Sequence, residues 1–532
     1  MNSKNKADVK LLRRNMAQNS GREEQDEGGV PRHARLANIG IAVAVAVLTA
    51  FVLQGTGYPL SAYFGLAALL LVFFYIFSRD IRRYRPALLG DTKKILLLAL
   101  LLFATIALSQ LTVRFSTHLA QEFHLDGKTV AFALPVSAGA MLACLLLDFR
   151  LALGLSFIAS ILLGILFRGD PFIPIYYFLG SIVAALSVIR CKKRTAVIKA
   201  GALTGLVNIV VIACIDLYGG DLSARAAADL GAGFLGAMAV TAIVSVTLPF
   251  FEAVFDIATD IKLLELLDPN HPLLKDLVYK SPGTYHHSIL IGNLAEAAAE
   301  AVNENSILAR VGAYYHDIGK IHKPEYYIEN QHPSENKHDR LIPSMSSLII
   351  ASHVKDGVED ARAHRLPKAV IDIIQQHHGT SLITYFYRKA KELNPYASIA
   401  EADYRYPGPR PRTKVAAIVM LADSVEAASR ALEDPTHQRI QALTDSVITR
   451  IFLDGQLSLC DLTLKDLREI SRSFNLVLNG IYHHRIDYPG MEFPGDKKRG
   501  DHQDKKQSAG KKPGAGKVQD TAREAVAEFR SS

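Results

Sequence analysis

The chain has 532 residues, which is room for two or more domains, and hydrophobic residues make up 49% of it. Its formal net charge of +8 sits largely in two polar tails and two short loops between apolar segments, so we expect no nucleic-acid polymer as a partner. The four cysteines lack CxxC spacing, which argues against a disulfide framework and against a thiolate zinc site.

The first 36 residues are charged and contain glycine, too long and too acidic for the start of a signal peptide. We predict a disordered cytoplasmic arm over 1–36, and a transmembrane helical domain over 37–251. A membrane span needs about 20 mostly apolar residues. The candidate spans are 37–54, 60–78, 95–111, 130–148, 151–167, 172–189, 196–216 and 230–251.

The loops of this domain indicate its orientation. Residues 79–94 and 190–194 are strongly basic, whereas 112–128, 168–171 and 217–229 are nearly neutral. Basic loops stay on the cytoplasmic side, which places the N-terminus and the second half of the chain in the cytoplasm, and an even number of spans agrees. Ionisable residues inside the spans look nearly absent, which disfavours a transporter. Small residues over 231–245 predict close helix packing.

The second half of the chain is polar, and 14 of the 18 histidines lie between 271 and 484. We expect a linker helix over 252–275, an α-helical domain over 276–490 and a disordered Lys/Gly-rich tail over 491–532. The fold class is therefore all-α throughout. Apolar periodicity predicts helices over 252–268, 284–304, 306–317, 342–355, 367–378, 413–432 and 463–482. Residues 434–462 are less clear and could hold a short strand pair.

Five of these helical segments carry a histidine or an aspartate that could bind metal. His287 lies in a first helical turn, His316 and Asp317 end the next helix, and His353 ends a later one. His377 and His378 precede Gly379, a C-cap, and Asp423 lies inside an apolar helix, where a carboxylate needs a partner. One histidine alone is more often a cap or a satisfied core residue, and Asp423 alone could pair with an arginine. Together they favour a shared metal site.

The ligand types narrow the choice of metal. Imidazole and carboxylate without thiolate suit Mn, Fe, Co, Ni or Zn rather than Mg or Ca. Five histidines and two aspartates exceed the needs of one ion, so we expect two divalent transition-metal ions bridged by Asp317. Two adjacent metals are suited to hydrolysis of a phosphoester.

These residues resemble the HD phosphohydrolase superfamily in its HDIG form. The stretches "GTYHHS", "YYHDIGKIHKPEYYIENQ", "SHVKDGVEDA", "QQHHGTSLITYFYRKA" and "YRYPGPRPRTKVAAIVMLADSVEAASR" are similar to the PgpH-type seven-transmembrane HD proteins, which are cyclic-di-AMP phosphodiesterases. "RRYRPALLG" after a span extends the resemblance to the membrane half, so that it covers about 37–490.

The resemblance implies a multi-pass protein of the bacterial cytoplasmic membrane whose HD domain opens cyclic-di-AMP to pApA with two Mn or Fe ions. By the same resemblance one metal would be held by His287, His316, Asp317 and Asp423. The second would be held by Asp317, His353, His377 and His378. Asp317 and Lys320 would be catalytic, and Lys320 and Tyr285 would contact the substrate. Lys320 could equally be a cation that the helix dipole favours at a helix C-terminus, with no role in catalysis.

Two departures from the family pattern bear on function. Residues 55–59, "GTGYP", stand where members of this family usually carry a large extracytoplasmic domain. The stretch "HHGTSLITYFYRKA" lacks the Gly-Tyr-Pro continuation of relatives that cleave cyclic-di-GMP. Two alternatives stay open: a phosphodiesterase of cyclic-di-GMP or another nucleotide, and a membrane sensor that binds a nucleotide without cleaving it. The expected partners are a cyclic dinucleotide and the lipid bilayer, and a homo-oligomer is an open option.

Overall fold

The computed structural model describes residues 31–482 apart from 124–126, 168–169, 190, 221–223, 332–335, 397 and 433. Over this part of the chain the structure is helical, and the only β pairing is an isolated bridge between Leu382 and Arg405. This confirms the all-α fold class. The predicted tail and most of the predicted arm lie outside the described residues.

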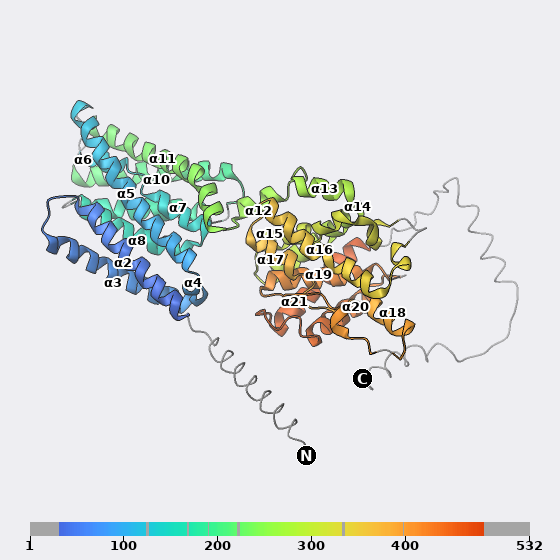
Figure 1. Cartoon of the computed structure of the whole chain (residues 1–532). Helices are drawn as coiled ribbons and strands as arrows, with labels where there is room; N and C mark the ends of the chain where they lie inside the picture. The colour runs from blue at the N-terminus through green and yellow to red at the C-terminus, as the bar shows by residue number, and fades with distance from the viewer. Residues whose placement is uncertain are drawn as a thin grey trace, which may run out of the picture. The chain divides into compact units, whose positions relative to one another are not determined.

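The first half of the chain forms a bundle of apolar helices (Figure 1). Seven helical segments among the described residues have the length and composition to cross a membrane. They comprise α2 (Arg32–Gln54), α3 (Leu60–Tyr84), α5 (Thr92–Phe123), α6 with α7 (Gly127–Phe132 and Ser137–Leu146), α8 (Phe149–Leu166), α10 (Arg194–Gly219) and α11 (Ala224–Phe255). The short helix α4 (Pro86–Gly90) lies in the first basic loop.

One predicted span, 172–189, corresponds to α9 (Phe172–Leu186), which has 15 residues and is shorter than the other seven segments. The eight-span count therefore stays a prediction. Helix α2 starts at Arg32, so it includes the last residues of the predicted arm.

Two buried carboxylates occur in this bundle at the edges of the predicted spans, so they do not contradict the prediction that ionisable residues inside the spans are nearly absent. Asp216 in α10 and Asp229 in α11 are almost fully buried near the ends of their helices. Asp216 pairs with Lys128 at 2.8 Å, and Asp229 accepts a hydrogen bond from Thr129. Each carboxylate has one oxygen paired with a residue of α6, which lowers the cost of its burial, although Asp216 Oδ2 has no hydrogen-bond partner among the described residues.

Small residues bring α10 and α11 together, as predicted for 231–245. The two helices lie side by side (Figure 1), and a Cβ added at Gly201 would collide with Thr241. Gly236 lies against the backbone of Ala133, and a Cβ at this position would be only 2.9 Å from the carbonyl oxygen of Ala133. Gly231, one and a half turns away on α11, faces open space.

The second half is also helical and has its own hydrophobic core. Its helices are α12 (Asp260–Leu266), α13 (Pro272–Lys280), α14 (Pro282–Ala301), α15 (Ser306–Tyr315), α16 (Pro343–Ala363), α17 (Lys368–Gln376), α18 (Thr384–Leu393), α19 (Lys414–Ser429), α20 (His437–Leu453) and α21 (Leu464–Ile481). Five 3₁₀ segments join them: η1 (Ile318–His322), η2 (Pro324–Tyr326), η3 (Ile328–Asn330), η4 (Lys337–Arg340) and η5 (Glu401–Tyr404). Helix α19 is apolar on all sides and is packed against α14, α15, α17 and α20.

Three predicted elements differ from the structure. The helix predicted over 252–268 is interrupted at Asp256, which has a positive φ of 55°, and α12 then packs its Leu263 and Leu266 into the domain core. Helix α16 continues to Ala363, so His353 lies inside it and not at its end. The short strand pair considered for 434–462 is wrong, because α20 fills most of that range.

We predict opposite effects for two Gly→Ala substitutions on α11. Alanine is favoured over glycine in a helix by up to about 1 kcal/mol. Gly231→Ala should therefore leave thermal stability in detergent unchanged or slightly raised. Gly236→Ala should lower it by about 1–3 kcal/mol, because the new methyl group overpacks against a backbone that cannot rotate away. Equal melting of the two variants in a gel-filtration thermal assay would contradict this packing.

Candidate metal centre

The motif "HDIGK" lies at the end of α15, where the chain turns into η1. Tyr315 is fully buried, and its hydroxyl donates to the carbonyl oxygen of Leu266 at 2.8 Å, which anchors the end of the helix. Gly319 has no room for a side chain, since a Cβ there would collide with the backbone of His353 and Gly357 in α16. The absence of a side chain therefore lets η1 lie directly against α16 and brings Asp317 beside His353.

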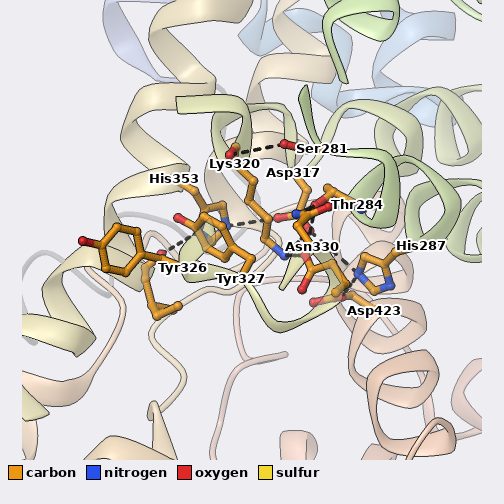
Figure 2. Close-up of polar contacts among 12 residues, drawn as sticks. Ser281, Thr284, His287, Asp317, Lys320, Tyr326, Tyr327, Asn330, His353 and Asp423 are labelled. Carbon is orange, nitrogen blue, oxygen red and sulfur yellow. Dashed lines mark hydrogen bonds and ion pairs between the residues drawn. The ribbon is translucent and has the colours of Figure 1, made fainter. Parts of the chain in front are cut away.

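One group of candidate ligands comes from α14, α15 and α19. His287, His316 and Asp423 each offer an atom to a common point, all within 4.8 Å of one another. His287 Nε2 lies 3.0 Å from Asp423 Oδ1, and His316 Nε2 lies 3.9 Å from the same oxygen. Figure 2 shows His287 and Asp423 facing each other across this point.

A second group comprises Asp317, His353, His377 and His378, again with one atom each within 4.8 Å of the others. His353 Nε2 lies 3.2 Å from Asp317 Oδ1, and His377 Nε2 lies 3.7 Å from that oxygen. The second oxygen of the same carboxylate, Oδ2, lies 3.1 Å from His316 Nε2. Asp317 thus turns one oxygen toward each group, which is the geometry of a bridging ligand.

Three of the histidines are oriented by their own helices. The Nδ1 atoms of His316, His353 and His377 lie 2.6–2.7 Å from the carbonyl oxygens three residues earlier. A carbonyl only accepts, so each Nδ1 must carry the proton and donate it. The Nε2 lone pair of the neutral ring is then left pointing into the site, ready to bind a cation.

The charges of the site suit metal binding. Burial lowers the pKa of His353 and His377, which keeps both rings neutral. Burial alone would raise the pKa of Asp317, but neighbouring His316 and Lys320 hold it well below its usual range. For His287, burial by itself would lower the pKa of the ring. Its hydrogen bonds to Asp423 and Glu426 outweigh this effect and raise the pKa to about 9.

Two buried atoms test whether these residues fit a metal ion. His316 Nε2 and Asp317 Oδ1 are buried and have no hydrogen-bond partner among the residues that the structure describes. Such groups are costly inside a protein unless something satisfies them. Both belong to the two ligand groups, and imidazole nitrogen with carboxylate oxygen is a usual donor set for divalent transition metals. The residues therefore fit the ions that were predicted from the sequence.

The structure brings together all seven residues that were predicted as ligands. Lys320 joins them, with its Nζ 2.6 Å from Asp317 Oδ2. Tyr285 is half-buried and its ring lies against that of the exposed His286, so its substrate contact stays a prediction. His322 is exposed and pairs with Asp360 at 2.8 Å, as expected of a residue outside the site.

Two acidic residues of the site were missed. Glu426 accepts at 2.6 Å from Nδ1 of His287 and so orients that ring. It follows Asp423 by three positions in the same apolar helix, a spacing that puts both carboxylates on one face and could have indicated it. Glu329 binds Lys320 at 2.8 Å from a 3₁₀ segment, for which no periodic pattern exists.

Each half of the chain matches a known protein family. Residues 58–259 match the family described as 7TM receptor with intracellular HD hydrolase. Residues 284–428 match the HD domain family. The second range begins three residues before His287 and ends five residues after Asp423, so it contains both ligand groups.

The chain is also similar to curated proteins of two bacteria. It is 40% identical over 401 residues to the cyclic-di-AMP phosphodiesterase PgpH of Bacillus subtilis, covering 74% of this chain and 56% of that protein. It is 42% identical over 365 residues to PgpH of Listeria monocytogenes, covering 68% of this chain and 50% of that protein. The chain thus spans about half the length of these relatives.

A solved structure is similar as well. The HD domain of L. monocytogenes PgpH in complex with cyclic-di-AMP is 52% identical to this chain, with a TM-score of 0.39, and the match covers 41% of this chain and 100% of that domain. The matches to the two family profiles and to both curated relatives together give one assignment. The chain belongs to the PgpH-type family of seven-transmembrane proteins with an HD hydrolase domain.

Proposed function

We propose that this protein is a membrane-anchored, metal-dependent phosphodiesterase that hydrolyses cyclic-di-AMP to pApA. The observation that carries the proposal is the position of Asp317, whose two oxygens face two separate groups of buried ligands. The curated relatives that match most of this chain are named cyclic-di-AMP phosphodiesterases, which supports the choice of substrate.

The proposed ligands divide between two ions. His287, His316 and Asp423 would hold the first ion, and His353, His377 and His378 the second, with Asp317 shared between them. When bound, the two ions would activate a water molecule and neutralise the phosphate oxygens. We propose Mn or Fe, because histidine and aspartate without cysteine favour such metals over Mg or Ca.

A cavity of about 500 Å³ next to the ligands would admit the substrate. His377, His378 and Asp423 form part of its wall, and Tyr406 stacks on the ring of His378 with centroids 4.2 Å apart. His378 and Asp423 are the least buried of the seven proposed ligands, with 21% and 12% of their side chains exposed. The centre is therefore most open on the side of this cavity.

Charged side chains of the chain would position the phosphates. Arg405 and Arg450 line the same cavity; Arg405 is paired with Glu401 and Asp454, so Arg450 is the stronger candidate for a phosphate contact there. Lys320 is a further proposed phosphate contact. Its ammonium has three donors, and two of them are directed at Asp317 and Glu329, so the third would serve a phosphate oxygen.

The proposed orientation places the HD domain in the cytoplasm. The basic loop around α4 and the basic residues before α10 would both face inward, which is where Lys and Arg accumulate in short loops. This arrangement requires α9 to return across the membrane despite its short length. Cyclic dinucleotides made in the cytoplasm would then reach the site directly.

The first test is hydrolysis by the full chain in nanodiscs, loaded with Mn or Fe(II) and offered cyclic-di-AMP, cyclic-di-GMP and a simple phosphomonoester. Products are identified by mass. Preferential conversion of cyclic-di-AMP to pApA supports the proposal, whereas preference for cyclic-di-GMP would replace its substrate. Binding of a nucleotide by the metal-loaded protein without cleavage would favour a sensor instead.

Asp317→Asn should remove the bridge while keeping the size of the side chain. We expect bound metal to fall and turnover to drop by more than about 100-fold. Losing a residue that only orients a ligand usually costs about 10–100-fold, and Asp317 is a proposed ligand itself. Metal content and pApA formation are measured on the same preparation. Asp360→Asn, which changes a carboxylate paired with the exposed His322 outside both ligand groups, is the control and should keep both. Full turnover by Asp317→Asn would contradict a bridging role.

Metal affinity should increase with pH. In the metal-free protein His287 keeps a proton up to a pKa of about 9, and a metal ion must displace it. At a pH below this pKa, each metal ion that binds must release one proton from His287. The apparent metal affinity should therefore rise by about tenfold for each unit of pH increase. Competition with a chelating dye between about pH 7 and 9 measures the slope. His287→Gln should lose this slope and His286→Gln should retain it; an unchanged slope in His287→Gln would assign the proton elsewhere.

A further inference from the structure

A second buried carboxylate approaches the metal centre without belonging to either ligand group. Glu329 lies in η3, and only 10% of its side chain is exposed. Its Oε1 accepts hydrogen bonds from Lys320 Nζ at 2.8 Å and from Thr284 Oγ1 at 3.0 Å. The ammonium of Lys320 is therefore held between Glu329 on one side and Asp317 on the other.

A set of contacts fixes η3 against the first turn of α14. Asn330 donates from Nδ2 to Thr284 Oγ1 at 2.8 Å and accepts from the backbone N–H of Thr284 at 3.2 Å. The second contact satisfies one of the N–H groups that the start of a helix leaves without a partner. A Cβ at Gly283 would collide with the backbone of Glu329, so the two segments touch there. Figure 2 shows Thr284 and Asn330 close together beside Lys320 and Asp317.

Tyr327, the residue just before η3, lies against the same ammonium. The Tyr327 ring has Lys320 Nζ 5.0 Å from its centroid and lies edge-on to the ring of His353, with centroids 5.9 Å apart. The ammonium is thus confined by a carboxylate, an aromatic ring and Asp317. Only 12% of the Lys320 side chain is exposed.

We infer that Glu329 is a positioning residue that shares the ammonium of Lys320 with Asp317 and so keeps it from pairing with that bridging carboxylate alone. The inference rests on the proposed function and adds a residue to it. Without the charge of Glu329, Lys320 would pair with Asp317 alone. The ammonium would then compete with the metal ions for Oδ2 and would be drawn away from an approaching phosphate. Glu329 acts through Lys320 and touches neither the ligand groups nor the cavity of about 500 Å³.

The test compares Glu329→Gln, Lys320→Met and the double variant in the full chain. Glutamine keeps the shape of the side chain and can still accept from Thr284. We expect Glu329→Gln to lower kcat on cyclic-di-AMP by about 10–100-fold with KM changed by less than about threefold. Because Glu329 acts through Lys320, the double variant should be no slower than Lys320→Met. Losses that multiply in the double variant, or a Glu329→Gln enzyme as fast as wild type, would overturn the inference.

The matched control is Glu325→Gln. Glu325 lies four positions earlier in the same run of 3₁₀ segments, is 44% exposed, and pairs with Lys337 at 3.2 Å away from the ligands. Its substitution should leave kcat, KM and metal content unchanged. If Glu329→Gln does not fold, Thr284→Val takes its place, since it removes the hydroxyl that links Glu329 to Asn330.

A readout without metal or substrate separates this inference from the proposed function. Lysines of the metal-free protein are reductively methylated, and the peptide that contains Lys320 is followed by mass spectrometry. Lys320 should react at least several-fold faster in Glu329→Gln than in wild type or Glu325→Gln. Equal labelling rates would overturn the positioning role. If instead wild type cleaves no cyclic dinucleotide while labelling responds as expected, the substrate is wrong and the positioning of Lys320 stands.

Discussion

The site depends on a carboxylate, Asp317, that is almost completely removed from water. An ionised carboxylate in such a place is unstable unless cations or donors surround it. Here four imidazoles and one ammonium converge on its two oxygens from α14, α16, η1 and the residues that follow α15 and α17. The helices of the domain are thus arranged around one buried charge, and removing that charge leaves several polar groups facing each other without a common partner.

Close backbone contacts are what allow this convergence. Gly319 lets η1 lie on the backbone of α16, and Gly283 lets η3 lie on the first turn of α14. Helix α19 contributes Asp423 and Glu426 from an otherwise apolar surface packed between its neighbours. A side chain at either glycine would push apart segments whose polar atoms must meet within about 3 Å to form hydrogen bonds.

The membrane half follows a different physical rule. Its helices bury small residues against one another and leave large apolar side chains on the outside, as expected where lipid is the solvent. Only residues 55–59 join α2 to α3. The chain also spans about half the length of its curated relatives, so the regulation of those proteins does not transfer to this one by similarity.

The sequence by itself determined the all-α class, the order of the apolar and polar halves, and all seven proposed ligands. Its periodicity and the local chemistry of histidine and aspartate are sufficient for those assignments. Helix ends were less predictable: α16 continues to Ala363, past Gly357, where η1 packs against it. The sequence also suggested that Asp317 lies between two groups of ligands, and the structure shows one oxygen turned toward each. Only the tertiary structure decided that Glu426 orients His287 and that Glu329 reaches Lys320. These contacts join residues brought together by packing, and no local pattern along the chain encodes such distances.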